Sequence, residues 1–316
     1  MSGTVLETYD PFFNLAVEDY LLHNSNKEYC LIYINDPSVV VGRHQVIYRE
    51  TNYFTAEKLN IPVIRRISGG GTVYHDRGNL NYSFIINSAK GMQVDFVRHT
   101  RPVIEFLNIN GIPAVLSGKS DITVNGFKVS GNAEHVFRER VLHHGTLLFD
   151  ASLETMNSLL RGDAVGYSTK AIGSNRMQVM NLKGRIINIE TTEELAIKFF
   201  EFMKEYFQGI EEFVLTTDEI KEISRLAESK YRSWEWNQGF SPAYSFRDYF
   251  EAYESPHVVN MFVKDGIIWK CTIEGSDIMA AVAKSLIGCR HMYDDIRNMF
   301  KAQGVMINDS EILKFF

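Results

Sequence analysis

The sequence predicts an α/β protein of the α+β type, in which a large domain precedes a small C-terminal α/β domain. Three observations support this prediction. Short β-branched and apolar runs recur in the first half of the chain, stretches with helical periodicity follow them, and no internal repeat or low-complexity tract is present. With 316 residues and 45% hydrophobic content, the chain is long enough to bury two cores.

The first elements are expected to be strands. YCLIYIND (29–36) and SVVVGRHQ (38–45) are rich in β-branched and apolar residues, as buried strands are. TNYFTAEKLN (51–60) then indicates a short helix. IPVIRRIS (61–68) and TVYHDRGNLNYSFIIN (72–87) predict strands on either side of three consecutive glycines. The glycines are therefore expected in a strand-to-strand loop.

Later elements show clearer boundaries. Residues 94–110 carry a helical stripe that Pro102 is expected to break. Asn125-Gly126, flanked by alternating residues, predicts a hairpin. Two further helices begin with the spacing of a capping box, which pairs a threonine with a glutamate three residues later. These pairs are Thr191 with Glu194, and Thr216 with Glu219.

The last part of the chain predicts a separate small domain. Residues 240–255 interrupt the preceding pattern with a Pro-containing, acidic stretch, which indicates a domain boundary. Residues 257–275 then predict strands with a turn at Asp265-Gly266, and two helices are expected over residues 276–288 and 292–304. We place the domains at residues 1–245 and 246–316.

Charge and cysteine usage exclude several classes of protein. The chain carries 33 Lys+Arg against 39 Asp+Glu, a formal net charge of −6, so it lacks the positive field that holds nucleic acid. The first residues are acidic where a signal peptide is basic, and no apolar run reaches the roughly 18 residues of a membrane span. Cys30, Cys271 and Cys289 are too widely spaced for a disulfide framework or a zinc site. We expect a soluble cytoplasmic protein.

Residues 65–79, RRISGGGTVYHDRGN, carry the first candidate site. Consecutive glycines permit positive φ and let successive N–H groups point into one concavity that binds an anion. Arginine complements such a nest with a planar fork suited to phosphate or carboxylate. The stretch lacks both the GK[ST] of a Walker A loop and the GxGxxG that opens a helix. It indicates another kind of phosphate site, and a loop with purely backbone requirements is the alternative.

Residues 125–135, NGFKVSGNAEH, carry the second cluster. Lys128 follows the hairpin turn, and Gly131 with Ala133 keeps the neighbourhood open. A lysine near an anion nest can neutralise charge on a phosphate during displacement, whereas a solvated surface lysine is the alternative. Asp121, just upstream, is expected to hold Mg²⁺ or a nucleotide hydroxyl, or else to cap the turn.

HHGTLLFD forms the third cluster. Adjacent histidines on a strand point to opposite faces, so His143 and His144 do not easily ligate one metal. With His75 and Asp76 upstream, a metal site stays open, but no HExxH-like spacing supports it. Histidines that line a pocket are the favoured interpretation. Ser68 lacks the context of a nucleophile elbow, so a Ser-His-Asp triad is not expected.

The stretches RRISGGGTVYHDRGNLNYS, KVSGNA and HHGTLLFD, in this order and at these separations, resemble the three signature stretches of the lipoate-protein ligase A family. SWEWNQG, residues 233–239, is similar to the family's stretch near the end of its large domain. The resemblance implies a large mixed-sheet catalytic domain related to biotin ligases, followed by a small C-terminal accessory domain.

The resemblance also implies an activity in two steps. Lipoate and MgATP give lipoyl-AMP and pyrophosphate. The lipoyl group then passes to one lysine of a lipoyl domain in a 2-oxoacid dehydrogenase complex, or of the glycine-cleavage H protein. Lys128, in KxSGxA, is implied as the catalytic group beside the lipoyl carbonyl and the α-phosphate.

Residue by residue, the resemblance implies two sets of contacts and one metal ligand. The residues expected to contact ATP and lipoyl-AMP are Arg66, Ser68, Gly70, Gly71, Thr72, Val73, Tyr74, Asn79, Asp121 and Lys128. The residues expected to line the lipoate pocket are Val73, His75, Gly131, Ala133 and His144. Asp121 is the expected ligand of Mg²⁺ bound with ATP.

Two other functions fit the same motifs. A lipoyl or octanoyl transferase would use a preformed acyl donor without ATP activation. A thioester route would need a nucleophilic cysteine, and the apolar strand around Cys30 does not suit one. A noncatalytic binder of lipoate or nucleotide is expected to lose Lys128. Ile67 and Thr72 depart from residues common in the family and leave the acyl preference open. Lipoate-dependent release of pyrophosphate from ATP separates the ligase from these alternatives.

Overall fold

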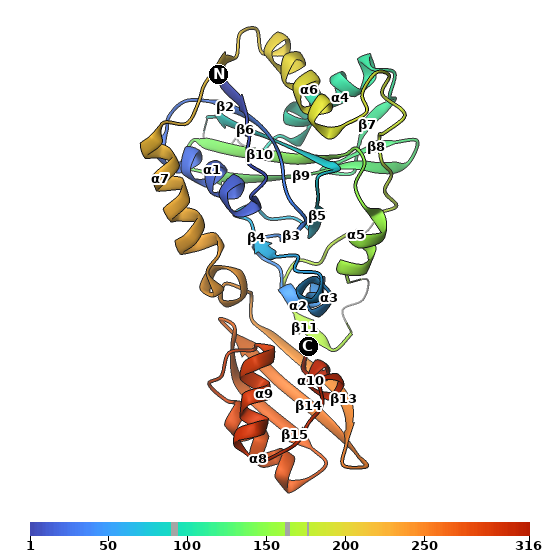
Figure 1. Cartoon of the computed structure of the whole chain (residues 1–316), viewed down its shortest axis with the longest axis vertical. Helices are drawn as coiled ribbons and strands as arrows, with labels where there is room; N and C mark the ends of the chain where they lie inside the picture. The colour runs from blue at the N-terminus through green and yellow to red at the C-terminus, as the bar shows by residue number, and fades with distance from the viewer. Residues whose placement is uncertain (90–93, 162–164, 176) are drawn as a thin grey trace.

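The computed structural model describes residues 1–89, 94–161, 165–175 and 177–316. Figure 1 shows two units stacked along the long axis, and the larger one is built on an eight-stranded sheet. In spatial order its strands are β12 (Glu211–Glu212), β1 (Ser2–Val5), β2 (Tyr29–Ile34), β6 (Asn79–Asn87), β10 (Arg140–Leu148), β9 (Phe127–Phe137), β8 (Asp121–Val124) and β7 (Ala114–Ser117). β1 pairs in parallel with both neighbours, whereas the pairs from β2 to β7 are antiparallel. The predicted α/β class with a large mixed sheet is therefore confirmed.

A second, three-stranded sheet packs on one face of the large sheet. Its strands are β4 (Val63–Arg65), β3 (Ser38–Val41) and β5 (Val73–His75), in this spatial order. Val40 and Ile64 of the small sheet share a buried core with Leu31 and Ile85 of the large one. The three glycines connect β4 to β5, so the predicted strand-to-strand loop is confirmed.

Helices cover both faces of the large sheet (Figure 1). α4 (Phe96–Ile109) and α6 (Thr192–Tyr206) bury Phe106 and Phe199 on one face. α1 (Pro11–Asn24) and α7 (Thr217–Leu226) bury Leu15 and Ile223 on the other, beside the small sheet. Both predicted capping boxes are present, at the starts of α6 and α7. Apolar packing on the two sides thus fixes the large sheet between helical layers.

Two expectations about single elements need correction. Pro102 does not break its helix, because α4 runs through it. The proline removes one backbone N–H, while burial of Val103, Phe106 and Leu107 keeps the helix on the sheet. Residues 72–87 form two strands in different sheets, β5 and β6. The chain turns between them at Gly78, where an added Cβ would lie 2.0 Å from the carbonyl oxygen of Asp150.

The lower unit contains the elements predicted for the C-terminal region. These are β13 (Tyr244–Ala252), β14 (Ser255–Lys264), β15 (Ile267–Glu274), α8 (Asp277–Leu286) and α9 (Tyr293–Ala302). The predicted turn is present, with φ of 53° at Asp265 and 70° at Gly266. The fourth strand of this sheet, β11 (Tyr167–Thr169), comes from the middle of the chain and pairs with β13. The division at residues 245 and 246 stays a prediction, and the residues on both sides of it lie in one strand.

Aromatic residues join the two units. The rings of Tyr48 and Phe54 contact the ring of Phe316 at centroid distances of 4.9 and 5.0 Å. Tyr48 also donates its hydroxyl to the carbonyl oxygen of His291, at 2.9 Å. The remaining helices are α2 (Ile47–Glu50), α3 (Tyr53–Lys58), α5 (Leu153–Leu159), α10 (Asp309–Ile312), η1 (Ala227–Tyr231), η2 (Glu235–Gly239) and η3 (Leu313–Phe315). Within the described ranges, no helix has the length and apolar character needed to cross a membrane.

Candidate active site

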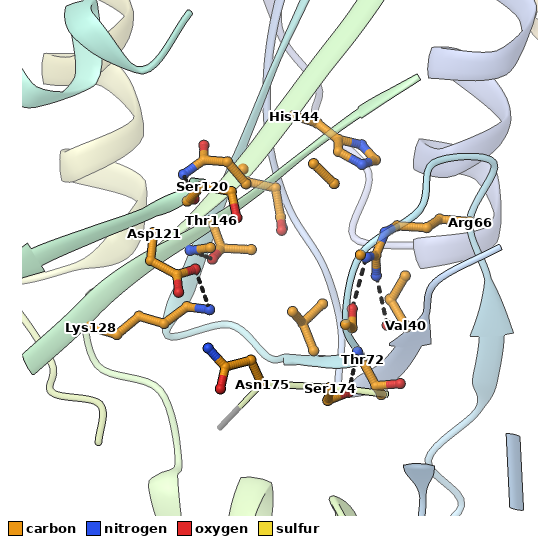
Figure 2. Close-up of a pocket in the computed structure, with 18 of the residues that line it drawn as sticks. Val40, Arg66, Thr72, Ser120, Asp121, Lys128, His144, Thr146, Ser174 and Asn175 are labelled. Atoms are coloured by element: carbon orange, nitrogen blue, oxygen red, sulfur yellow. Dashed lines mark hydrogen bonds and ion pairs between the residues drawn. The ribbon is translucent and has the colours of Figure 1, made fainter. Parts of the chain in front are cut away.

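A cavity of about 420 Å³ lies between the large sheet and the small one. Figure 2 shows its two ends. Lys128 and Asp121 lie on one side, and Arg66, Val40 and His144 lie on the other. The first end is on β8 and β9, whereas the second is formed by the small sheet and by β10. The cavity therefore runs across the strands of the large sheet.

The end at Lys128 is built by an irregularity between β8 and β9. The register shifts between Ile122 and Thr123, so that Asp121 pairs with Gly131 while Thr123 pairs with Lys128. The shift brings Lys128 Nζ to 2.7 Å from Asp121 Oδ1. Gly131 makes room for this pair, since an added Cβ would lie 3.0 Å from both Cε and Nζ of Lys128. The lysine is 21% exposed at its side chain and faces the cavity.

Each of the three glycines of the loop has a different surrounding. A Cβ on Gly69 would meet no atom within 4 Å. Gly70 has a φ of 85°, which L side chains rarely adopt. A Cβ on Gly71 would lie 3.2 Å from the hydroxyl oxygen of Ser174. The loop therefore needs glycine for backbone shape at Gly70 and for a close approach at Gly71.

The two adjacent arginines point into different places. Arg65 is fully buried and donates to the backbone carbonyls of Gly42, Gln45 and Asn237, so it ties the small sheet to the SWEWNQG segment. Burial lowers its pKa to about 9. It lines neither of the cavities near the site.

Arg66 supports the glycine loop from inside the cavity wall. Its guanidinium donates to the carbonyl oxygens of Val40 at 3.0 Å, Gly69 at 2.6 Å and Gly71 at 2.7 Å, and its Nε–H donates to Ser68 Oγ at 2.9 Å. Four of its five N–H donors bond to described residues, and the fifth has no hydrogen-bond partner among them. Burial lowers its pKa to about 10, so the group stays charged at neutral pH.

A segment from the middle of the chain closes over the glycine loop. Ser174 Oγ donates to Glu50 Oε2 at 2.6 Å and accepts the backbone N–H of Thr72 at 3.0 Å. Gln45 Nε2 donates to the same hydroxyl at 3.1 Å, and its Oε1 accepts the hydroxyl of Thr72 at 2.8 Å. Sequence reasoning missed this wall of the site because no motif marks Ser174 or Glu50.

Ser68, His144 and Glu18 form a hydrogen-bonded chain that was not expected. Ser68 Oγ lies 2.6 Å from His144 Nε2, and His144 Nδ1 lies 2.8 Å from Glu18 Oε2. Because the Glu18 carboxylate only accepts, His144 Nδ1–H donates to it, and in the neutral ring Nε2 then accepts the hydroxyl of Ser68. Ser68 is fully buried behind the cavity wall, which makes it a support of Arg66 rather than a nucleophile. Glu18 lies in α1, 126 residues from His144 in sequence, where no local pattern points to it.

His143 lies on the opposite face of the sheet from His144, as predicted. Its Nδ1 is 3.0 Å from Glu134 Oε1, which His99 Nδ1 also approaches at 2.8 Å. Its Nε2 lies 3.2 Å from Asn132 Oδ1. The adjacent histidines therefore do not share one ligand site, and His75 lies on the His144 side.

Apolar side chains line the cavity toward its other end, beside Arg66 and His144. Leu15 of α1, Tyr33 of β2, and Val40 and Val73 of the small sheet line it, together with His75. All five residues predicted for the lipoate pocket lie on the cavity wall. A second cavity, of about 130 Å³, shares Thr72, Lys128 and Ser174 with the first and is lined by Tyr74, Leu148, Met156, Asn157, Leu160 and Val179.

The predicted nucleotide contacts divide into two groups. The residues that line the larger cavity are Arg66, Gly70, Gly71, Thr72, Val73, Asp121 and Lys128, and Tyr74 lines the smaller one. Ser68 and Asn79 lie behind the wall. Asn79 is buried on β6 and donates its amide to Asn81 at 3.0 Å, and Asn81 lines the cavity in its place.

Comparisons with known proteins point to one family. Residues 10–201 match the family described as lipoyl protein ligase A/B catalytic domain. Lipoate-protein ligase 1 of Staphylococcus aureus is 36% identical over 91% of this chain and 89% of its own. Lipoate-protein ligase LplJ of Bacillus subtilis is 36% identical over 84% of this chain and 82% of its own.

Solved structures of lipoate protein ligases have a fold similar to that of this chain. A putative lipoate protein ligase from T. acidophilum with bound lipoic acid aligns with a TM-score of 0.63 and 25% identity, over 76% of this chain and 100% of its own. A bipartite lipoate protein ligase described with its E2 lipoyl domain, from Thermoplasma acidophilum, aligns with a TM-score of 0.65 and 25% identity, over 76% and 97%. A lipoate-protein ligase A bound with ATP aligns with a TM-score of 0.63 at 24% identity, over 76% and 100%, which shows the fold alone.

Proposed function

This chain belongs to the lipoyl protein ligase A/B family of enzymes, and we propose that it activates lipoate with ATP before it transfers the lipoyl group to protein. In the first half-reaction the lipoate carboxylate attacks the α-phosphate of ATP, which gives lipoyl-AMP and releases pyrophosphate. In the second, the amine of an acceptor lysine attacks the lipoyl carbonyl. An amide bond forms, AMP leaves, and the amine loses a proton.

One observation supports this proposal most strongly. The Lys128 and Asp121 pair lies at one end of the cavity, and apolar side chains line the cavity toward the other end, where Arg66 also lies. The end at Lys128 suits a carboxylate and a phosphate, and the apolar lining suits an aliphatic chain and its ring. Both reacting groups then lie beside Lys128. Its ammonium would stabilise the charge that develops at the α-phosphate, and later the charge at the carbonyl oxygen.

The nucleotide would occupy both cavities. We place its phosphates between Lys128 and the glycine loop, and its base in the smaller cavity, which Thr72 and Lys128 line together with Tyr74 and apolar residues. Asp121 fits a Mg²⁺ ion bound with ATP, because such ions take one or two carboxylates and complete their shell with phosphate oxygens and water. The ion would neutralise phosphate charge. Asp121 itself also orients the ammonium of Lys128.

The acceptor is proposed to be the lipoyl domain of an E2 subunit or another lipoyl-domain protein, since a relative is described with its E2 lipoyl domain. A cytoplasmic location also stays a proposal.

Lipoate-dependent pyrophosphate release from ATP by the purified chain, followed by mass spectrometry of a lipoyl domain, tests the proposal. Both products are expected. Transfer from synthetic lipoyl-AMP without any pyrophosphate release would instead assign the chain as a transferase that uses a preformed donor. Binding of lipoate without either reaction would assign a noncatalytic binder.

A further inference from the structure

His75 carries a buried ring nitrogen that has no hydrogen-bond partner in the part of the chain that the structure describes. His75 is 5% exposed, and its Nε2 makes no hydrogen bond to the residues that the structure describes. Its Nδ1 lies 3.0 Å from the amide nitrogen of Asn35. His75 also lines the cavity. The position of its proton therefore decides whether the cavity wall offers a donor or an acceptor.

The hydrogen bonds of two asparagines fix this proton. Asn14 Nδ2 donates to the backbone carbonyls of Thr8 at 3.0 Å and Ile34 at 3.4 Å, which accept only. The same nitrogen donates to Asn35 Oδ1 at 2.8 Å. Asn35 therefore turns its amide N–H₂ to His75, whose Nδ1 must accept. The proton of the neutral ring lies on Nε2.

The ring is neutral at ordinary pH. Burial, and then the charge of Arg66, lower the pKa of His75 to about 3. The N–H of His75 is thus a buried donor with no partner among the described residues, and a buried donor that stays unpaired is costly. A ligand that brings an acceptor to this point is favoured over one that does not.

His75 lies far from the charged end of the cavity. Asn35, which holds it, directly follows β2, whereas Asp121 begins β8. Four strand spacings separate β2 from β8 in the sheet, about 19 Å at roughly 4.8 Å each. If the lipoate carboxylate lies at Lys128, its chain runs toward β2 and its ring faces the His75 end.

We propose that the Nε2–H of His75 donates a hydrogen bond to a sulfur of the dithiolane ring, which makes His75 a specificity-determining residue for lipoate over saturated acids. This inference rests on the proposed function, because it assumes that lipoate fills the cavity. Divalent sulfur is a weak acceptor, and a hydrocarbon ring or chain offers none. A site built around a hydrogen bond discriminates against an analogue that lacks the matching group.

The test compares lipoate with 5-cyclopentylpentanoate, which has the same ring size and chain but no sulfur. In lipoate-dependent pyrophosphate release, the wild-type chain is expected to favour lipoate by about 3- to 10-fold in kcat/KM, the scale of one weak hydrogen bond. His75→Phe keeps an aromatic ring and removes the donor, so it should bring this ratio close to one, mainly by slowing lipoate. Equal use of both acids by the wild type would overturn the inference, as would an unchanged ratio in His75→Phe.

A second measurement does not depend on activity or on the folding of the variant. Nitrogen-15 NMR of the wild-type histidine rings should show His75 neutral at pH 7, with its proton on Nε2. Addition of lipoate should shift that N–H signal, whereas the cyclopentyl acid should shift it less. A proton on Nδ1 would contradict the inference. If the ring signal behaves as expected but no pyrophosphate is released, the proposed ligase function fails and the donor assignment stands.

Discussion

Lys128 Nζ lies 2.7 Å from Asp121 Oδ1, at the end of the cavity that faces the glycine loop. The pair holds a compact positive charge beside the place proposed for the α-phosphate and the lipoyl carbonyl. Lys128→Ala should therefore slow both half-reactions by about 10²- to 10³-fold, the scale for loss of one preorganised electrostatic group. Thermal unfolding should change little, because the head group is partly exposed.

Two further measurements sharpen this prediction. Lys128→Arg should restore little activity, since a planar fork does not replace a point charge beside Gly131. Transfer from synthetic lipoyl-AMP to a lipoyl domain measures the second step alone. Wild-type transfer by Lys128→Ala would confine the lysine to adenylation, and wild-type rates in both steps would remove it from the reaction.

Neighbouring glycines in one loop give a matched pair of variants. A Cβ on Gly71 meets Ser174, whereas a Cβ on Gly69 meets nothing within 4 Å. Gly71→Ala should push the segment around Ser174 away from Thr72 and Glu50, and so speed tryptic cleavage after Lys170. Trypsin should cleave the Gly69→Ala variant at the wild-type rate. Equal cleavage of the two variants would show that the contact at Gly71 does not hold this segment.

The cysteines should be dispensable for both half-reactions. Burial raises the pKa of the Cys30 thiol far above its usual range and raises the pKa of Cys271 to about 12, so neither forms a thiolate nucleophile at neutral pH. Cys30→Ala should keep the wild-type rates of adenylation and transfer, with a small loss of stability from the buried site. Retained adenylation with lost transfer would support a thioester route. Cys289→Ser, at a half-buried position, is the control.

Stability should depend on pH through Asp19. Burial opposes its charge, but hydrogen bonds from His23 and Lys230 outweigh burial and lower its pKa to about 2. A carboxyl with a lowered folded pKa stabilises the fold above its unfolded value of about 4, and this contribution, about 2 kcal/mol here, is lost as pH falls toward 2. Asp19→Asn should lower the free energy of urea unfolding by this amount at pH 5, and the difference should shrink as pH falls and vanish only below about pH 2.

His23, which donates a hydrogen bond to Asp19, should make the stabilisation by Asp19 decrease at alkaline pH as well. The hydrogen bond to Asp19 raises the pKa of His23, so its contribution is complete below about pH 6.5 and is lost as pH rises through the raised value. The difference between wild type and Asp19→Asn should therefore be largest between about pH 4 and 6.5. His23→Gln should remove the decrease at alkaline pH and keep the one at acidic pH. A difference that does not vary with pH would contradict the assignment.

Local chemistry allowed part of this structure to be predicted from sequence. The turn at Asn125-Gly126, the capping boxes and the opposite faces of His143 and His144 depend only on neighbouring residues, and they are present. The signature stretches also indicated the cavity wall. Their side chains lie on strands that the large sheet and the small sheet bring together.

Other features depend on contacts that no local pattern encodes. Arg65 and Arg66 are identical in type and adjacent, yet only the fold decides that one is sealed against the SWEWNQG segment and the other supports the glycine loop. Glu18 and Ser174 reach the site from distant parts of the chain. The helix through Pro102 persists because tertiary packing outweighs the loss of one backbone hydrogen bond.

The strand β11 ends at Thr169, five residues before Ser174. Five residues span at most about 18 Å when fully extended, so this connection acts as a short tether between the lower sheet and the segment at Ser174 that closes over the glycine loop. Any displacement of the C-terminal unit beyond the slack of the tether would pull on the bonds that Ser174 makes with Thr72 and Glu50. A flexible insertion between Thr169 and Ser174 would lengthen the tether and leave both sheets intact, and it would thereby uncouple the motion of one unit from the opening of the other.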